Sequence, residues 1–205
     1  MNYLIYPLFS KPVYLKKINI DRNKILKMID DDFEKASIVN DSNVSERSNC
    51  TTVLNKRKFK FLKNILMNEF DQYNKEVLHY KNNFKMTTSW FTRAHENQGS
   101  NYHNHANSFI SGVLYLNCDN SAISFENFQK TKLFHLIPKK YNIYNSDAFT
   151  VKVSNCFLIF FPSETYHRIV NNNSNLTRYS LAFNLIPVGE IGDKKSDSFV
   201  EINIK

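Results

Sequence analysis

The stretch Tyr102-His103-Asn104-His105 is followed directly by ANSFISGVLYLN at residues 106–117, an apolar and aromatic run. Aromatic and β-branched residues favour strands, so the run predicts a strand. Alternate residues of an extended chain point to the same side. His103 and His105 could therefore direct two imidazoles into one cavity, as a metal centre requires. Two histidines at this spacing are a weak pattern, and an ordinary surface pair explains them equally well.

The composition is typical of a globular protein that is rich in strands. The chain has 205 residues, of which 42% are hydrophobic and 14% aromatic, including 17 Phe and 11 Tyr. This length predicts a single domain over residues 1–205. The net charge of +8 allows contact with nucleic acid or an acidic surface but does not require either.

The cysteines and the apolar runs indicate the compartment. Cys50, Cys118 and Cys156 are odd in number and lack CxxC spacing, so we expect reduced thiols. No apolar run is as long as a membrane span, and the N-terminus lacks the basic region of a signal peptide. These features predict a cytoplasmic protein without membrane contact.

Residues 1–83 predict N-terminal strands and supporting helices. Residues 3–20 alternate apolar and polar side chains around two prolines, which indicates edge strands. A helix is expected over residues 21–34, and a longer one over residues 53–80, where apolar side chains recur every three or four positions. The polar segment 36–52 predicts a loop.

From residue 84 onward, short apolar segments alternate with turn residues, which predicts a sandwich or barrel. The expected strands are residues 85–95, 108–116, 122–128, 132–137, 141–144, 148–153, 156–161, 167–171 and 177–186. The segment after Gly189 is polar and predicts a peripheral tail.

Two further motifs strengthen the interpretation of the histidine pair. His167 follows the apolar run 157–162 and lies 62 residues after His105. Arg178 comes eleven residues later and opens RYSLAFN at residues 178–184. Arg178 and Ser180 share one face of a strand, and a guanidinium beside a hydroxyl is suited to bind a carboxylate.

Several of these residues also have ordinary structural explanations. Asn184 could face the pocket or end a strand, and the second interpretation is preferred. Arg178 taken alone would be a surface ion-pair residue. Three other histidines are expected to be core or surface residues: His79, His95 and His135. The sequence lacks a G-x-S-x-G elbow and has only 4 glycines, which excludes the common hydrolase and phosphate-loop motifs.

A basic cluster marks the start of the longer predicted helix. It consists of Lys56, Arg57, Lys58, Lys60 and Lys63. A nucleic-acid surface is one interpretation of this cluster. A solvated helix face is the preferred one, because aromatic residues do not interleave with the charges.

The order of these motifs resembles the 2-oxoglutarate- and Fe(II)-dependent dioxygenases. His103-Asn104-His105 lies where that family has HxD/E, and residues 157–162 with His167 resemble its distal-histidine segment. Residues 103–116 and 178–184 resemble HxHxNSxxSGvyYl and RySlaFN of an oxygenase group found in bacteria and marine tailed phages. The resemblance covers approximately residues 84–190.

The resemblance implies a mainly β fold. Its core would be a jelly-roll or cupin-like double-stranded β-helix at residues 84–190, with helices of residues 1–83 packed on it and residues 191–205 as a tail. The implied reaction is hydroxylation of a substrate with release of succinate and CO₂. The implied cofactors are Fe(II) and the co-substrate 2-oxoglutarate, with ascorbate as an optional addition. If the chain is phage-encoded, its location would be the host cytoplasm.

The resemblance also implies the site residues. His103, His105 and His167 would be the catalytic metal ligands, and Arg178 and Ser180 would hold 2-oxoglutarate. His105 replaces the family's usual carboxylate, and three neutral imidazoles suit Zn(II) as well as Fe(II).

The replaced carboxylate leaves alternatives open. His105 could orient the loop while a carboxylate completes the metal site, the candidates being Glu96, Asp119 and Glu126. The chain could also be a metal-binding or degenerate jelly roll that binds a ligand or partner without turnover. Small molecules, proteins and nucleic acids all remain open as substrates, and the oligomeric state, including a homodimer, remains open as well.

Overall fold

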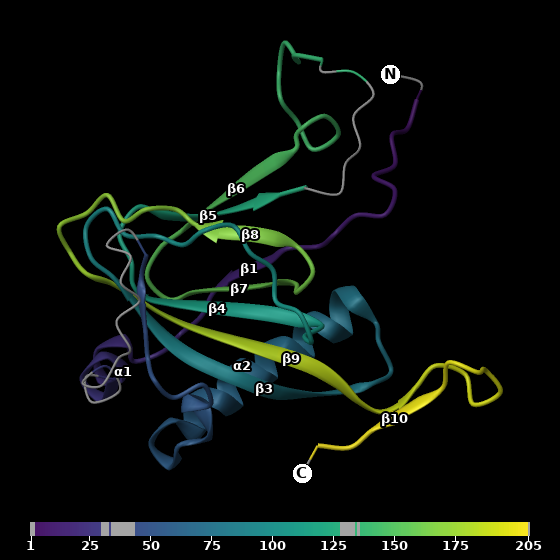
Figure 1. Ribbon diagram of the computed structural model, residues 1–205, viewed down its shortest axis with the longest axis horizontal. Coiled ribbons are helices and arrows are strands. Elements are labelled where there is room, and N and C mark those ends of the chain that lie inside the picture. The colour runs from purple at the N-terminus through teal and green to yellow at the C-terminus, as the bar shows by residue number, and fades with distance from the viewer. Residues whose placement is uncertain (1–2, 30–32, 34–43, 128–133, 135, 205) are drawn as a thin grey trace.

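The computed structural model describes residues 3–29, 33, 44–127, 134 and 136–204. A larger sheet contains β1 (Tyr14–Lys17), β2 (Glu46–Arg47), β3 (Asn83–Ala94), β4 (Ile110–Asn117), β7 (Phe157–Pro162), β9 (Arg178–Ile191) and β10 (Val200–Ile202). A smaller sheet contains β5 (Ser121–Glu126), β6 (Ala148–Val153) and β8 (Tyr166–Ile169). The strand orders are β1-β7-β4-β9-β3-β2, with β10 paired to β9, and β6-β5-β8. Two antiparallel sheets with this crossing order confirm the prediction of a mainly β jelly roll (Figure 1).

The helices pack on the outer face of the larger sheet (Figure 1). They are α1 (Arg22–Ile29), α2 (Lys60–Tyr73), the 3₁₀ turns η2 (Val53–Asn55) and η3 (Arg57–Phe59), and the π turn η4 (Asn74–Leu78). The apolar stripe of α2 reaches the sheet, where the ring of Tyr73 stacks on that of Phe160 with centroids 5.8 Å apart. Among the described residues, no helix is both long and apolar enough to cross a membrane.

Strand β4 shows why the apolar run after the histidines forms the centre of the fold. Leu114 and Leu116 point to the helix side and join the larger core, whereas Val113 and Tyr115 point between the sheets and join a second core. This alternation is the two-residue period of a strand that is buried on both faces. A central strand of this kind positions everything that follows the histidine pair.

Strand β9 has the same alternation but carries polar residues on its inner face. Leu181 and Phe183 lie in the core beneath the helices. Arg178, Ser180 and Asn184 alternate with them and are buried between the sheets. A buried polar row of this kind needs partners inside the barrel.

Some expected elements differ from the structure. The long helix expected over residues 53–80 begins only at Lys60, because Lys56 has extended backbone angles (φ −65°, ψ 137°) between the two 3₁₀ turns. Residues 141–144 form a turn instead of a strand, because the Asn142 and Asn145 side chains accept hydrogen bonds from nearby backbone N–H groups. Of the strand expected over residues 132–137, residues 132, 133 and 135 lie outside the described residues, and residues 134, 136 and 137 are not in a strand.

The ends of the expected N-terminal elements also differ. Of residues 3–20 only β1 is a strand, and the described part of the helix expected over residues 21–34 ends at Ile29. The expected loop over residues 36–52 contains β2, which pairs with β3. In the polar tail, β10 pairs with the end of β9.

Candidate functional site

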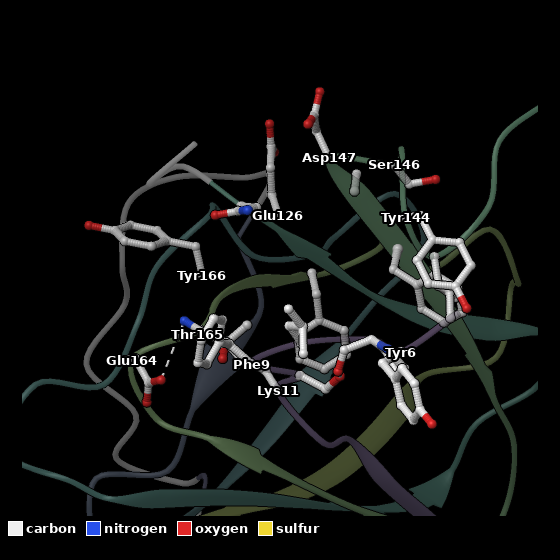
Figure 2. A pocket seen from close by; sticks show the side chains of 18 residues that line it. Tyr6, Phe9, Lys11, Glu126, Tyr144, Ser146, Asp147, Glu164, Thr165 and Tyr166 are labelled. Atoms are coloured by element: carbon white, nitrogen blue, oxygen red, sulfur yellow. Dashed lines mark hydrogen bonds and ion pairs between the residues drawn. The ribbon is translucent and has the colours of Figure 1, made fainter. Parts of the chain in front are cut away.

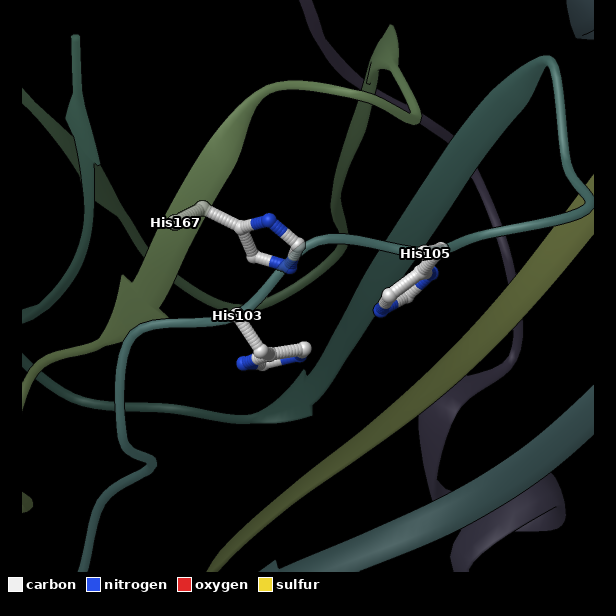
Figure 3. A group of neighbouring side chains, drawn as sticks. All are labelled: His103, His105 and His167. Atoms are coloured by element: carbon white, nitrogen blue, oxygen red, sulfur yellow. The ribbon is translucent and has the colours of Figure 1, made fainter. Parts of the chain in front are cut away.

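Three histidines meet between the sheets (Figure 3). His103 and His105 lie in the loop before β4, and His167 lies on β8. The backbone N–H groups of His103 and His167 each donate to the other residue's carbonyl, at 3.0 and 2.9 Å, and the His105 N–H donates to the Ser163 carbonyl at 3.0 Å. One ring nitrogen from each histidine lies within 4.8 Å of the others. Within the described residues, this is the only group of three or more His, Cys, Asp or Glu side chains close enough to share a metal ion.

Hydrogen bonds determine which ring nitrogen of each histidine is available. Nδ1 of His103 lies 2.8 Å from the Asn101 carbonyl oxygen, and Nδ1 of His167 lies 3.0 Å from the Thr165 carbonyl oxygen. A carbonyl only accepts, so each Nδ1 carries the proton and each Nε2 keeps its lone pair. Metal-ligating histidines are usually oriented in this way.

A side-chain network performs the same task for His105. Its Nδ1 lies 2.6 Å from Asn184 Oδ1 and 2.9 Å from Ser111 Oγ. The Asn184 amide nitrogen donates to Thr88 Oγ1 at 2.9 Å, which turns Oδ1 toward His105. Ser111 Oγ also lies 2.8 Å from both Asn184 Oδ1 and Ser163 Oγ. Since Oδ1 only accepts, the Nε2 of His105 is also left as the available lone pair.

The preferred sequence interpretation of Asn184 is wrong. It favours the end of a strand over the pocket, but Asn184 lies in the middle of β9 and lines the cavity beside the histidines. The signal that identifies it is its position, an even number of residues after Arg178 and Ser180 and therefore on their face of the strand.

Burial favours the neutral form of the His105 and His167 imidazoles. It lowers the pKa of His167 to about 3, although the hydrogen bond to the Thr165 backbone acts in the opposite direction. Burial also lowers the pKa of His105, against the opposing effect of the Asn184 hydrogen bond. Neutral imidazoles are the form that binds a metal, so neither group must lose a proton at neutral pH to do so.

The histidines lie along one side of a cavity of about 420 Å³. Arg178 and Ser180, the other two residues predicted for the site, line the same cavity. The Ser180 hydroxyl lies 2.6 Å from Thr92 Oγ1. The structure therefore brings all five predicted site residues to one cavity, whereas their roles remain predictions.

Arg178 is a buried cation, and its hydrogen-bond partners among the described residues are neutral. Its Nη1 donates to Ser121 Oγ at 2.7 Å and to the Val170 carbonyl at 2.8 Å. Throughout the described part of the chain, no carboxylate forms an ion pair with it. Burial lowers the pKa of Arg178, and the neighbouring Tyr115 and Cys118 act in the opposite direction. A buried guanidinium of this kind calls for an anionic ligand.

A second unsatisfied group lies beside Arg178. Tyr115 is fully buried and is the cross-strand neighbour of Ser180. Its hydroxyl has no hydrogen-bond partner among the described residues. Burial raises the pKa of the Tyr115 hydroxyl, and the positive charge of Arg178 acts in the opposite direction. A carboxylate bound at Arg178 would supply the acceptor that this hydroxyl lacks.

The alternative metal ligands do not join the histidines. Among the described residues, the cluster of metal-ligating side chains contains no carboxylate, so Glu96, Asp119 and Glu126 are all outside it. Glu126 instead lines a different cavity of about 480 Å³, at the end of β5 (Figure 2). His95 is exposed and is also outside the histidine cluster; its Nδ1 lies 3.1 Å from Thr177 Oγ1.

Comparisons with known proteins agree with this geometry. Residues 88–184 match a family model described as "Putative 2OG-Fe(II) oxygenase". A search of curated proteins gives no match.

Solved structures of similar shape include two prolyl hydroxylases. The prolyl hydroxylase of Trichoplax adhaerens, in complex with a hypoxia inducible factor peptide, is 11% identical, with a TM-score of 0.57 over 84% of this chain and 82% of that one. The viral collagen prolyl hydroxylase of Paramecium Bursaria Chlorella virus-1, in complex with 2OG, is 13% identical, with a TM-score of 0.53 over 84% and 95%.

The alpha ketoglutarate dependent carbocyclase SnoK from nogalamycin biosynthesis is 8% identical, with a TM-score of 0.61 over 85% of this chain and 79% of that one. At such identities the likeness shows a shared fold, which in these oxygenases is the double-stranded β-helix. The segment matched by the family model contains the three histidines, Arg178 and Asn184. Residues 88–184 of the chain are therefore similar to the 2OG-Fe(II) oxygenase family, and this similarity implies Fe(II) and 2-oxoglutarate as cofactors.

Proposed function

We propose that the protein is a dioxygenase that hydroxylates a substrate C–H bond and converts 2-oxoglutarate to succinate and CO₂. The observation that carries this proposal is a single cavity with two chemically different ends. Three imidazole lone pairs converge at one end, and a buried guanidinium without a described carboxylate partner lies at the other.

The donor set fits Fe(II). In this proposal His103, His105 and His167 hold the metal through Nε2, while an oxygen acceptor behind each ring fixes its orientation. Imidazole is an accepted ligand of Fe(II). Fe(II) with 2-oxoglutarate and O₂ would supply the oxidising chemistry, and the protein would supply orientation and dryness.

The inner face of the larger sheet has polar and apolar rows in the same order as the groups of 2-oxoglutarate. Paired residues form three successive rows across β3, β9 and β4, and these are Thr88–Asn184–Ser111, Trp90–Ala182–Val113 and Thr92–Ser180–Tyr115. The first row is polar and supports His105, the second is apolar, and the third is polar and adjoins Arg178. 2-Oxoglutarate has the same order of a polar keto acid, an apolar methylene pair and a polar carboxylate.

In this proposal, side chains on or beside these rows contact different parts of 2-oxoglutarate. Arg178 binds the far carboxylate through N–H groups other than those on Nη1, which already bonds Ser121 and Val170. Ser180 and the unsatisfied Tyr115 hydroxyl add donors to that carboxylate. Trp90, whose ring centroid lies 5.7 Å from that of His105, packs against the methylene groups and excludes water from the metal side.

One observation favours a second candidate function. All three proposed ligands are imidazoles, a donor set that also suits Zn(II). A metal-binding jelly roll without oxygenase turnover would use the same residues and would form no succinate.

An anaerobic titration separates the two functions. Adding Fe(II) and 2-oxoglutarate to the metal-free protein should produce a visible charge-transfer absorption, and admitting air should then yield succinate. His103→Ala and His167→Ala should remove both signals, whereas His95→Ala, outside the cluster, should retain them. Metal binding without the absorption or succinate would support the second candidate and contradict the first.

A further inference from the structure

A second arginine lines the cavity, at its opening. Arg47 lies on β2, where it pairs with Thr92 of β3, so it continues the row formed by Thr92, Ser180 and Tyr115. Unlike Arg178, Arg47 is exposed. An exposed side chain that also lines the cavity places its charge where a ligand would enter.

The segment that carries Arg47 is fixed to the loop that carries the histidines. The backbone N–H and hydroxyl of Ser45 both donate to the Gly99 carbonyl oxygen, each at 2.8 Å. Ser45, Ser100 and His103 line the cavity together with Arg47. Arg47 therefore belongs to the same rim as one of the proposed metal ligands.

No described carboxylate neutralises Arg47. Its neighbour Glu46 is bonded to Arg93 and lies 3.9 Å from His95, and no described acidic group forms an ion pair with Arg47. Among the described residues that line the cavity there are two arginines and no aspartate or glutamate.

The proposed metal centre increases this positive charge. A site with two histidines and one carboxylate contributes one negative charge to the metal, but His105 contributes none. The divalent metal and Arg178 together exceed the charge of a 2-oxoglutarate dianion, and Arg47 adds to the excess. A positive cavity with low-dielectric walls favours an anionic ligand.

We infer that the substrate carries an anionic group, a carboxylate or a phosphate, which Arg47 binds at the opening of the cavity. This inference rests on the proposed function and identifies the substrate class of that site. Arg178 holds the co-substrate inside the barrel, and Arg47 orients the substrate from the rim. Arg47 is thus a binding residue with no part in holding the metal.

Small probe molecules test this inference on the full chain loaded with Zn(II) and 2-oxoglutarate. Zn(II) replaces Fe(II) so that binding is measured without turnover. The probes are phenylacetate, phenyl phosphate and the neutral phenylacetamide, and their binding is measured by ligand-observed NMR. At least one anion should bind about tenfold more tightly than the amide, and the preferred anion identifies carboxylate or phosphate. Arg47→Gln should remove that preference, Arg47→Lys should retain part of it, and the control Arg57→Gln should leave it unchanged.

Three outcomes would overturn the inference. The inference fails if neither anion binds the wild-type protein better than the amide, and it also fails if Arg47→Gln leaves the preference intact. Alternatively, Arg47→Gln could weaken 2-oxoglutarate binding, which would assign Arg47 to the co-substrate. The Fe(II)–2-oxoglutarate absorption of wild type and Arg47→Gln separates this failure from failure of the proposed function, since loss of the wild-type absorption would contradict the function itself.

Discussion

Replacing Asn184 by alanine tests whether the network behind His105 orients a metal ligand. Asn184 Oδ1 is the nearest acceptor of the His105 Nδ1–H, at 2.6 Å, and its removal frees the ring to rotate. Loss of such a supporting bond typically costs about 10–100-fold in metal affinity. Ser111 Oγ, at 2.9 Å, remains as a second acceptor, so we expect the lower end, about tenfold, or ~1.4 kcal/mol.

The double variant Asn184→Ala/Ser111→Ala removes both acceptors and should approach a 100-fold loss. Asn184→Asp retains an acceptor for His105 and should keep the wild-type affinity or exceed it. The assay is competition for Zn(II) against a chromophoric chelator at fixed pH, with folding checked by circular dichroism.

A matched control separates orientation from stability. Asn172 is also buried and donates to the Ala94 and Leu176 carbonyls at 3.0 and 2.8 Å, but it does not contact the histidines. Both Asn184→Ala and Asn172→Ala should lower the free energy of unfolding, by about 1–3 kcal/mol. Only Asn184→Ala should weaken metal binding. Equal metal affinities of the two variants and the wild type would refute the orienting role.

Three further predictions concern the core and the cavity. Tyr115→Phe removes a hydroxyl that has no described partner, so the metal-free protein should become about 1 kcal/mol more stable while its 2-oxoglutarate affinity falls about fivefold. Urea unfolding measures the stability and ligand titration measures the affinity. If stability and affinity both rose, or both fell, the proposed role of the Tyr115 hydroxyl would be contradicted. The pKa of His167 is lowered to about 3, so between its ordinary value of 6.5 and about 3 the unfolded chain binds more protons. The metal-free protein should therefore be most stable above about pH 6.5 and lose stability as the pH falls, by at most about 1.4 kcal/mol per pH unit from this group. The free energy of unfolding of His167→Gln should depend less steeply on pH. Equal pH dependence of the wild type and this variant would contradict the reasoning. Gly112→Ala would place a Cβ 2.3 Å from the Phe183 ring, so it should cost about 1–3 kcal/mol in urea unfolding, and Phe183→Leu in the same chain should recover part of that loss.

Local sequence patterns were sufficient for the parts of the fold with a regular period. The run after His105 alternates between two buried faces, so its two-residue period and apolar content already predict β4. The shared face of Arg178 and Ser180 follows from the same period, and both residues line the cavity. The long apolar helix was predicted, but not the extended Lys56 that delays its start.

Contacts between distant segments could not be predicted in this way. Asn184 reaches His105 across 79 positions, and the unsatisfied hydroxyl of Tyr115 exists only because other strands enclose it. Arg47 belongs to a strand of two residues, which is too short to show a period. These residues carry much of the chemistry of the site because their partners are supplied by the fold.

The identity of the third metal ligand is the central claim, and anomalous diffraction tests it most directly. Crystals of the protein loaded anaerobically with Fe(II) and 2-oxoglutarate, measured on both sides of the iron edge, should show one iron bonded to Nε2 of His103, His105 and His167, at about 2.0–2.2 Å. Iron bonded to only two of these histidines and to a carboxylate of the chain would contradict the account.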